Sequence, residues 1–190
     1  MNLRPSLAFA LAGLSLLGAQ ARADQYVIDP AHTWVTFEVR HFGTSTNRGR
    51  FDKKEGTITL DPAAKTGQAN ITIDMGSIDT GTEKLDTHLK SDTFFNVAKF
   101  PTATFVGNKF TFDGDKVKSV SGTLTLLGVT RPVTLTATHY NCYVNPMTQA
   151  HVCGGDFETS FARSSFGMTG LIPLVPDQVH LLVQVEAFKQ

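Results

Sequence analysis

The sequence predicts an all-β protein, an antiparallel up-and-down barrel of eight or nine strands with one short helix. After residue 23, apolar and polar residues alternate along almost every stretch, which is typical of strands with one buried and one exposed face. Turn-forming residues separate these stretches, and a single segment departs from the two-residue period. Such strands must close into a barrel or stack as a sandwich, and a small barrel is either filled by side chains or holds one small ligand.

The first 23 residues have the pattern of a secretory signal peptide. Arg4 precedes an apolar run over residues 7–17, which is too short to span a bilayer, and Ala21-Arg22-Ala23 is a small-residue cleavage site. An N-terminal anchor helix is the alternative, but no stop-transfer pattern follows. We therefore expect residues 1–23 to be removed and residues 24–190 to form one barrel domain in the periplasm, without stable membrane insertion.

The composition gives no sign of a strongly basic binding surface. Without Arg4 and Arg22, 15 basic residues stand against 17 acidic ones, a net charge of −2 with neutral histidines. This balance gives no reason to expect nucleic acid as a partner. Fourteen phenylalanines against one tryptophan and three tyrosines suit either a large apolar interior or a densely packed sandwich.

Nine segments alternate in the manner of strands, and turn residues divide them. Asp113-Gly114 lies between two alternating runs and is a strong hairpin signal, while residues 128–132 and Asn145-Pro146 break two further pairs. The expected strands cover residues 34–40, 48–53, 56–60, 67–74, 102–112, 116–127, 131–144, 150–161 and 178–189.

The segment 82–90 has helical spacing instead. Thr82 suits the N-cap position, and Leu85 and Leu89 fall on one face of the expected helix. The aromatic segment 92–101 that follows could plug one end of the barrel.

Cys142 and Cys153 flank the Asn145-Pro146 turn and can face each other across a hairpin. Export permits the disulfide that we expect here. Free thiols are one alternative, and a metal site with His139 and His151 is another. The metal site is disfavoured because His139 and Cys142 would lie on opposite faces of a strand. We expect neither a metal nor a cofactor.

Local catalytic signatures are absent from the sequence. It contains no G-x-S-x-G, no H-E-x-x-H, no glycine-rich phosphate loop and no C-x-x-C. No single stretch brings together a nucleophile, a base and an orienting acid, so the pattern does not favour an enzyme.

Three polar residues are candidates for ligand contact. His32 and His41 bracket the first long strand and would point to opposite faces if that strand is regular. Arg163 lies among aromatic residues and serines, where its charge could bind an anionic head group. Each has a structural alternative, namely a hydrogen-bonded histidine for the first two and an ion-paired residue that closes one barrel end for Arg163.

The opening segment over residues 26–43, YVIDPAHTWVTFEVRHFG, resembles the first motif of the YceI-like proteins. Further stretches match that family in order along the chain, and ordered blocks are far more specific than any one of them. These stretches are GRF at 49–51, SIDT at 77–80, HLKS at 88–91, FFNVAKFP at 94–101, GTLTLLGVTRPV at 122–133 and RSSFGM at 163–168.

The resemblance implies a lipocalin-like, antiparallel eight-stranded barrel with an elongated hydrophobic cavity that binds polyisoprenoid or other long-chain lipids in the periplasm. It also implies that a homodimer or a b-type cytochrome partner can occur, because the family includes dimers and relatives fused or adjacent to such cytochromes. The Cys142–Cys153 hairpin departs from the family pattern and leaves the cavity unaffected.

We accordingly expect a binding protein, not an enzyme, that holds a polyprenyl or quinone-type isoprenoid lipid for carriage, storage or scavenging. One alternative is an enzyme that acts on an isoprenoid or quinone lipid with a histidine as general base. Another is a stress-response module with a filled core and a cytochrome partner. The polar mouth is expected at His32, His41 and Arg163, and the lipid tail is expected to contact Phe37, Phe94, Phe95, Phe105, Phe161, Phe166 and Met168.

Overall fold

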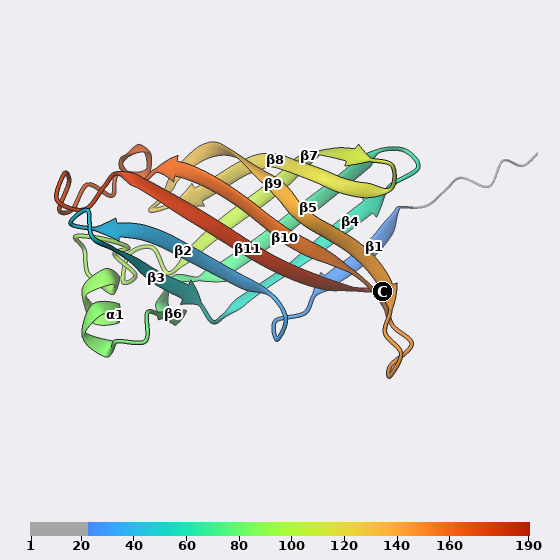
Figure 1. Cartoon of the computed structure of the whole chain (residues 1–190), viewed down its shortest axis with the longest axis horizontal. Helices are drawn as coiled ribbons and strands as arrows, with labels where there is room; N and C mark the ends of the chain where they lie inside the picture. Colours follow the sequence, from blue (N-terminus) through green and yellow to red (C-terminus); the bar gives the residue numbers. More distant parts are fainter. Residues whose placement is uncertain (1–22) are drawn as a thin grey trace, which may run out of the picture.

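The computed structural model describes residues 23–190, so the predicted signal peptide lies outside the described residues except for Ala23. Strands make up most of this part of the chain (Figure 1). They are β1 (Asp24–Ile28), β2 (Trp34–His41), β3 (Ser45–Phe51), β4 (Lys54–Asp61), β5 (Thr66–Asp74), β6 (Ile78–Asp79), β7 (Thr102–Asp113), β8 (Lys116–Leu126), β9 (Val129–Val144), β10 (His151–Ala162) and β11 (Gln178–Lys189). The helical elements are η1 (Met75–Ser77), α1 (Glu83–Lys90) and η2 (Arg163–Phe166).

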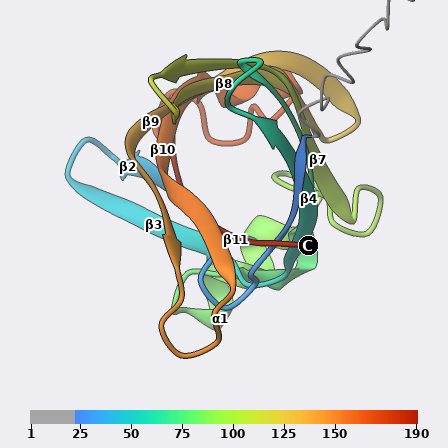
Figure 2. The ribbon, with the colours of Figure 1, turned by 90° about the vertical axis from the view of Figure 1, so that its right-hand side faces the viewer.

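The strands form a closed antiparallel barrel. β7 to β11 pair in chain order, and the ring closes where β1 pairs with both β4 and β11. Figure 2 shows this ring of strands nearly end-on. Three barrel strands are interrupted, so the eleven segments of the described chain make eight strands around the ring. The predicted eight-stranded antiparallel barrel is therefore confirmed.

The turn over residues 29–33 causes the first interruption, between β1 and β2. The backbone amide of Asp29 donates to the carbonyl oxygen of Glu186 at 2.8 Å, and the Asp29 carboxylate accepts from the amide of Ala31 at 2.9 Å. The side chain of Thr33, which is buried, makes two further hydrogen bonds with the backbone of Glu186. The turn is thus fixed on β11, and β1 and β2 both pair with that strand.

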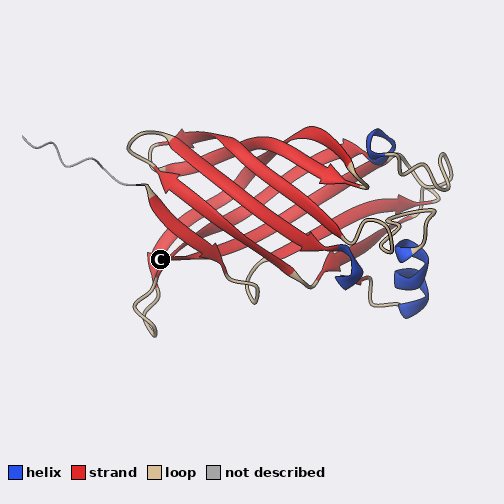
Figure 3. Cartoon of the chain, turned by 180° about the vertical axis from the view of Figure 1, so that it is seen from behind, coloured by secondary structure: helices blue, strands red, loops and turns tan. Residues whose placement is uncertain are grey.

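The two ends of the barrel differ (Figures 1 and 3). The helical elements, the β2–β3 turn and the loop between η2 and β11 gather at one end, which we call the helical end. The β9–β10 hairpin projects from the opposite end, which we call the hairpin end. Within residues 23–190, no helix is long and apolar enough to cross a membrane.

All nine predicted strands correspond to strands of the barrel, with ends that differ by at most three residues. The strand prediction did not include β1 or the two-residue β6. Helix α1 begins one residue after Thr82, as predicted, but the Thr82 side chain makes no capping hydrogen bond. The backbone carbonyl of Thr82 instead accepts from the amides of Leu85 and Asp86.

A glycine makes room for an aromatic cluster inside the helical end. Gly49 of β3 lies opposite Phe37 of β2, and a Cβ atom on Gly49 would lie 2.4 Å from the Phe37 ring. The Phe37 ring packs against those of Phe51 and Phe95, with centroids 6.0 and 6.3 Å away. Phe95 and its neighbour Phe94 are buried, so the aromatic segment after α1 contributes to the core.

The predicted disulfide is present near the hairpin end. Cys142 of β9 and Cys153 of β10 are directly opposite each other in the strand register and are joined by an S–S bond. The half-buried Cys153 packs against the hydrophobic core, so this crosslink ties the long hairpin to the barrel interior.

We predict that the double variant Cys142→Ala/Cys153→Ala loses about 3 kcal/mol of unfolding free energy. The disulfide spans a sequence separation of 11, and closing a loop of this length restricts the unfolded chain by about that amount. Urea unfolding of both proteins without reductant measures the difference. Dithiothreitol should destabilise the wild type and leave the double variant unchanged, and equal midpoints for the two oxidised proteins would contradict the prediction.

Candidate ligand-binding cavity

The main cavity lies inside the barrel at the helical end and has a volume of about 300 Å³. Apolar side chains from β2, β5, β7, β8, β10 and β11 form most of its wall. His41 and Leu171, which also line it, are exposed to solvent, so the cavity opens between the β2–β3 turn and the loop after η2. The volume is at the lower end of the range typical of small-ligand pockets.

The predicted tail-binding residues fall into three groups. Phe105 lines a second cavity deeper in the barrel. Phe166 lines neither cavity; it is buried behind the wall, and its ring centroid lies 5.2 Å from that of Phe161. The five that line the main cavity are Phe37, Phe94, Phe95, Phe161 and Met168.

The second cavity has a volume of about 90 Å³ and continues toward the hairpin end. Val35 belongs to the walls of both cavities, so it lies between them. Tyr140 and Cys153 contribute to the wall of the second cavity. Burial raises the pKa of Tyr140 to about 12, so its phenol stays neutral at physiological pH. A tail longer than the main cavity would therefore have to pass Val35 to reach a second apolar space.

Three polar side chains without hydrogen bonds within residues 23–190 line the main cavity: His41, Asn47 and His88. His41 follows Phe37 and Val39 on the inward face of β2, and Asn47 lies opposite Val39 in the register. His88 comes from α1 and packs edge-on against Phe94, with ring centroids 4.8 Å apart. Each can donate or accept a hydrogen bond at the mouth of an otherwise apolar cavity.

The structure places Arg163 in the wall as an anchor for the loop that follows η2. The side chain is 3% exposed, and burial lowers the pKa of the guanidinium. Its nitrogens donate hydrogen bonds to three backbone carbonyls, those of Met168 at 3.2 Å and of Val175 and Pro176 at 3.0 Å each. These bonds use three of the five guanidinium N–H groups. Arg163 also lines the main cavity, so contact with an anionic head group through its remaining N–H groups stays a prediction.

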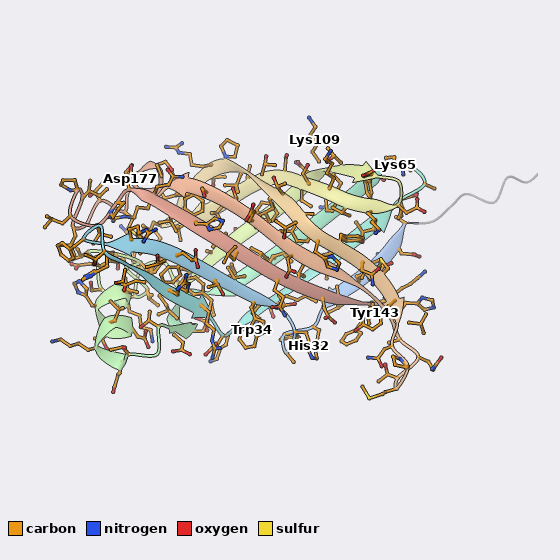
Figure 4. The ribbon with its side chains drawn as sticks, in the orientation of Figure 1. His32, Trp34, Lys65, Lys109, Tyr143 and Asp177 are labelled. Atoms are coloured by element: carbon orange, nitrogen blue, oxygen red, sulfur yellow. A yellow bond between two sulfur atoms is a disulfide. The ribbon has the colours of Figure 1, made fainter. Side chains whose placement is uncertain are left out.

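His32 lies away from both cavities, on the outer surface of the barrel (Figure 4). Its side chain is 64% exposed, and its Nδ1 lies 2.6 Å from the Asp29 carboxylate. The bond to Asp29 raises the pKa of His32. Burial alone would raise the pKa of Asp29, but hydrogen bonds from His32 and the amide of Ala31 hold it below its ordinary value. His32 thus stabilises the turn between β1 and β2.

This pair predicts a pH-dependent contribution to stability. The lowered pKa of Asp29 stabilises the fold above pH 3.8, and the raised pKa of His32 stabilises it below pH 6.5. The contribution is therefore largest between these values, and it falls as the pH rises through the folded pKa of His32 or drops through that of Asp29. We expect Asp29→Asn to return the His32 pKa to its ordinary range, as measured by NMR titration. An unchanged His32 titration in that variant would contradict the assignment, and the titration of His151 provides the control.

Several lining residues were not predicted from the sequence. Asn47 and His88 carry polar groups to the mouth, and Leu171 and Val175 bring the loop after η2 to the cavity. The hairpin register could have indicated Asn47, because it alternates with Gly49 on the inward face of β3. Within residues 23–190, no cluster of three His, Cys, Asp or Glu side chains could hold a metal ion.

An antiparallel eight-stranded barrel with an apolar cavity open at one end defines the lipocalin-like class of small barrel proteins. The sequence profile of the YceI-like domain matches residues 26–187, which is nearly the whole of the described barrel. The chain therefore belongs to the YceI-like family, as its motifs predicted.

Relatives agree with this assignment along almost the full chain. Protein YceI of Salmonella arizonae is 36% identical over 189 residues, with 97% of each chain covered. The crystal structure of the Campylobacter jejuni YceI protein is 28% identical with a TM-score of 0.68, over 80% of this chain and 90% of that one. Burkholderia cenocepacia BcnA is 26% identical with a TM-score of 0.67, over 84% and 98%. A polyisoprenoid binding domain from Saccharophagus degradans, 16% identical with a TM-score of 0.64 over 87% and 98%, shares the fold.

Proposed function

We propose that this protein is a periplasmic binding protein that holds a polyprenyl or quinone-type isoprenoid lipid in the main cavity, for carriage, storage or scavenging. The observation that carries the proposal is the apolar wall around about 300 Å³ of interior space that opens at one end. The same fold binds a polyisoprenoid in the Saccharophagus degradans domain. The predicted signal peptide and the disulfide both suit an oxidising compartment outside the cytoplasm.

The lipid tail accounts for most of the affinity in this proposal. Burial of each CH₂ group contributes about 0.8 kcal/mol. Ten buried carbons would contribute roughly 8 kcal/mol before ordering costs, which is the scale of micromolar binding. An apolar cavity can bind any branched or unbranched hydrocarbon that fits. The tail therefore determines whether a molecule binds tightly.

We expect side chains at the mouth of the cavity to form hydrogen bonds with the head group. His41, Asn47 and His88 line the cavity there and have polar atoms to offer a hydroxyl, carbonyl or phosphate oxygen. Arg163 also lines the cavity, but we assign it a positioning role because three of its N–H groups are bonded to the backbone of the loop. We therefore expect head-group selectivity to depend on the two histidines and the asparagine.

Organic extraction followed by mass spectrometry tests the proposal on protein purified from its native host. The comparison variant is Ala103→Phe, in which a phenyl ring on β7 would occupy part of the main cavity. We expect a long-chain isoprenoid in the wild-type extract and little of it in the variant extract. Equal amounts of lipid in the two extracts would show surface adsorption, and an empty wild-type extract would contradict binding. Chemical conversion of added lipid would indicate an enzyme.

A further inference from the structure

Large apolar side chains are exposed around the mouth of the main cavity. Phe42, in the β2–β3 turn, is 52% exposed, and its ring packs against that of His41 with centroids 4.4 Å apart. Leu171, Ile172 and Leu174, in the loop after η2, are 46%, 37% and 57% exposed. Because His41 and Leu171 also line the cavity, these apolar groups are continuous with its wall. We call Phe42, Leu171, Ile172 and Leu174 the collar.

The backbone holds the collar in an ordered arrangement. Phe42 and Leu171 have φ angles of +49° and +61°, in the left-handed region that bulky residues rarely adopt. Arg163 binds the loop at both of its ends, and the amide of Val175 donates to the carbonyl of Leu171 at 2.8 Å. Asparagine or glycine would fit such positions with less strain. Barrel folding therefore does not explain a phenylalanine and a leucine there, whereas contact with an apolar partner does.

The charges beside the collar complement an anionic surface. The loop over residues 164–176 has no charged residue, and the segment 40–48 has Arg40, Arg48 and no aspartate or glutamate. Arg40 is exposed, and the Arg48 side chain is 62% exposed although it is paired with Glu38. Burial of exposed apolar side chains and attraction of nearby arginines to anionic lipids both contribute to binding at a lipid surface.

Most acidic groups near the collar are already engaged within the protein. Glu38 accepts from Arg48 at 2.6 Å, and Asp177 accepts from the amide and hydroxyl of Ser164 at 2.8 and 2.6 Å. Asp86 of α1 accepts from the amide and hydroxyl of Thr80 at 2.8 and 2.6 Å, and Glu83 and Asp92 have Lys84 and Lys90 near them in the sequence. The basic side of the β2–β3 turn is therefore not opposed by a free acidic cluster.

We propose that the collar docks on the surface of an anionic phospholipid bilayer, with the cavity mouth facing the lipid. An isoprenoid could then move between the bilayer and the cavity without crossing water. This last step rests on the proposed function, but docking itself requires only the collar and the arginines. The two can therefore be tested separately, with vesicles that contain no isoprenoid and with isoprenoid presented in detergent.

Vesicle sedimentation tests docking directly. We expect wild-type protein to sediment with phosphatidylcholine vesicles that contain phosphatidylglycerol, and less with pure phosphatidylcholine. The variant Phe42→Asn/Leu174→Asp should reduce the partition coefficient by about tenfold or more, and Arg40→Gln by about fivefold. Neither Phe42, Leu174 nor Arg40 lines the cavity, so isoprenoid binding in detergent should be unchanged. The matched control is Met147→Asp, which replaces an 86% exposed apolar residue in the turn between β9 and β10.

Three outcomes would overturn docking. One is folded wild-type protein that does not bind either kind of vesicle. Another is an equal loss in the collar variant and in Met147→Asp. The third is a stable dimer without vesicles that dissociates on Leu174→Asp, which would assign the collar to a second copy of this chain. Vesicle binding by a protein that fails to bind isoprenoid in detergent would uphold docking and contradict the proposed function alone.

Discussion

Replacing Arg163 by alanine is expected to lower the free energy of unfolding by about 3–4 kcal/mol. The side chain is almost fully buried and bonds three carbonyl oxygens of the loop after η2. Its removal leaves these oxygens without their donor, and each unsatisfied buried group costs about 1–3 kcal/mol, less where water can reach it. The same loss should free the loop, so amide hydrogen exchange over residues 167–176 should become faster.

Two variants give this prediction its controls. Arg163→Lys keeps the charge but replaces a planar fork by a single ammonium group, so it should recover less than half of the loss. Arg131 is exposed and donates to the carbonyl of Ser165 at 3.1 Å, at the edge of the same region. Arg131→Ala should change the stability by about 0.5 kcal/mol or less. Urea unfolding measures all three.

The opposite result would support the ligand contact that the sequence predicts for Arg163. If Arg163→Ala leaves stability and exchange unchanged but weakens binding of a lipid with an anionic head, the guanidinium contacts ligand. If both lipid classes weaken equally and the protein is destabilised, the guanidinium holds the loop and thereby the mouth. The two roles thus separate by comparing an anionic and a neutral lipid of equal tail length.

The strands were predictable because burial of one face imposes a period of two on each of them. The clearest example is the alternating set Val179, Leu181, Val183 and Val185. Their alternation predicts β11, and the first two line the main cavity while the last two line the second. Alternation does not say which face of a strand points inward, and it does not show the break between β1 and β2. That break depends on hydrogen bonds between the turn at 29–33 and Glu186, far away in the sequence.

The polar residues of the site were less predictable, because their positions depend on partners that alternation does not reveal. His41 lies on the inward face of β2, and simple alternation from Phe37 through Val39 could have placed it there. His32 belongs to the same sequence motif, but its partner Asp29 fixes it on the outer surface. The partners of Arg163 are main-chain oxygens, which any sequence possesses, so no pattern of side chains could have indicated them.

The largest expected effect on binding comes from filling the main cavity with a larger side chain on β7. Ala103 is 3% exposed and lines this cavity, so Ala103→Phe should fill part of the space that a lipid tail would occupy. A phenyl ring displaces roughly six tail carbons, which corresponds to a gross loss of about 5 kcal/mol. Fewer tail carbons then have to be ordered, and this smaller entropic cost offsets about half of the gross loss. The affinity should therefore be about 100-fold lower.

Val106→Phe is the matched control, because Val106 is 38% exposed, on the outer surface of the same strand. It should bind like the wild type. Fluorescence titration with isoprenoids of increasing length adds a second criterion. In the wild type, each added isoprene unit should strengthen binding by about 1 kcal/mol until the cavity is full, after which affinity should stop rising. In Ala103→Phe the plateau should begin at a shorter tail.

Val35 is expected to limit the length of the isoprenoid tail that the interior can hold. Since it lies between the main and the second cavity, Val35→Ala should join them and move the plateau toward longer isoprenoids. A plateau at the same length in Val35→Ala would show that the second cavity is not used. Flat, weak binding at every length in the wild type would mean that the interior does not admit a tail, and the proposed function would be wrong. Equal losses in Ala103→Phe and Val106→Phe would place the bound lipid outside the barrel.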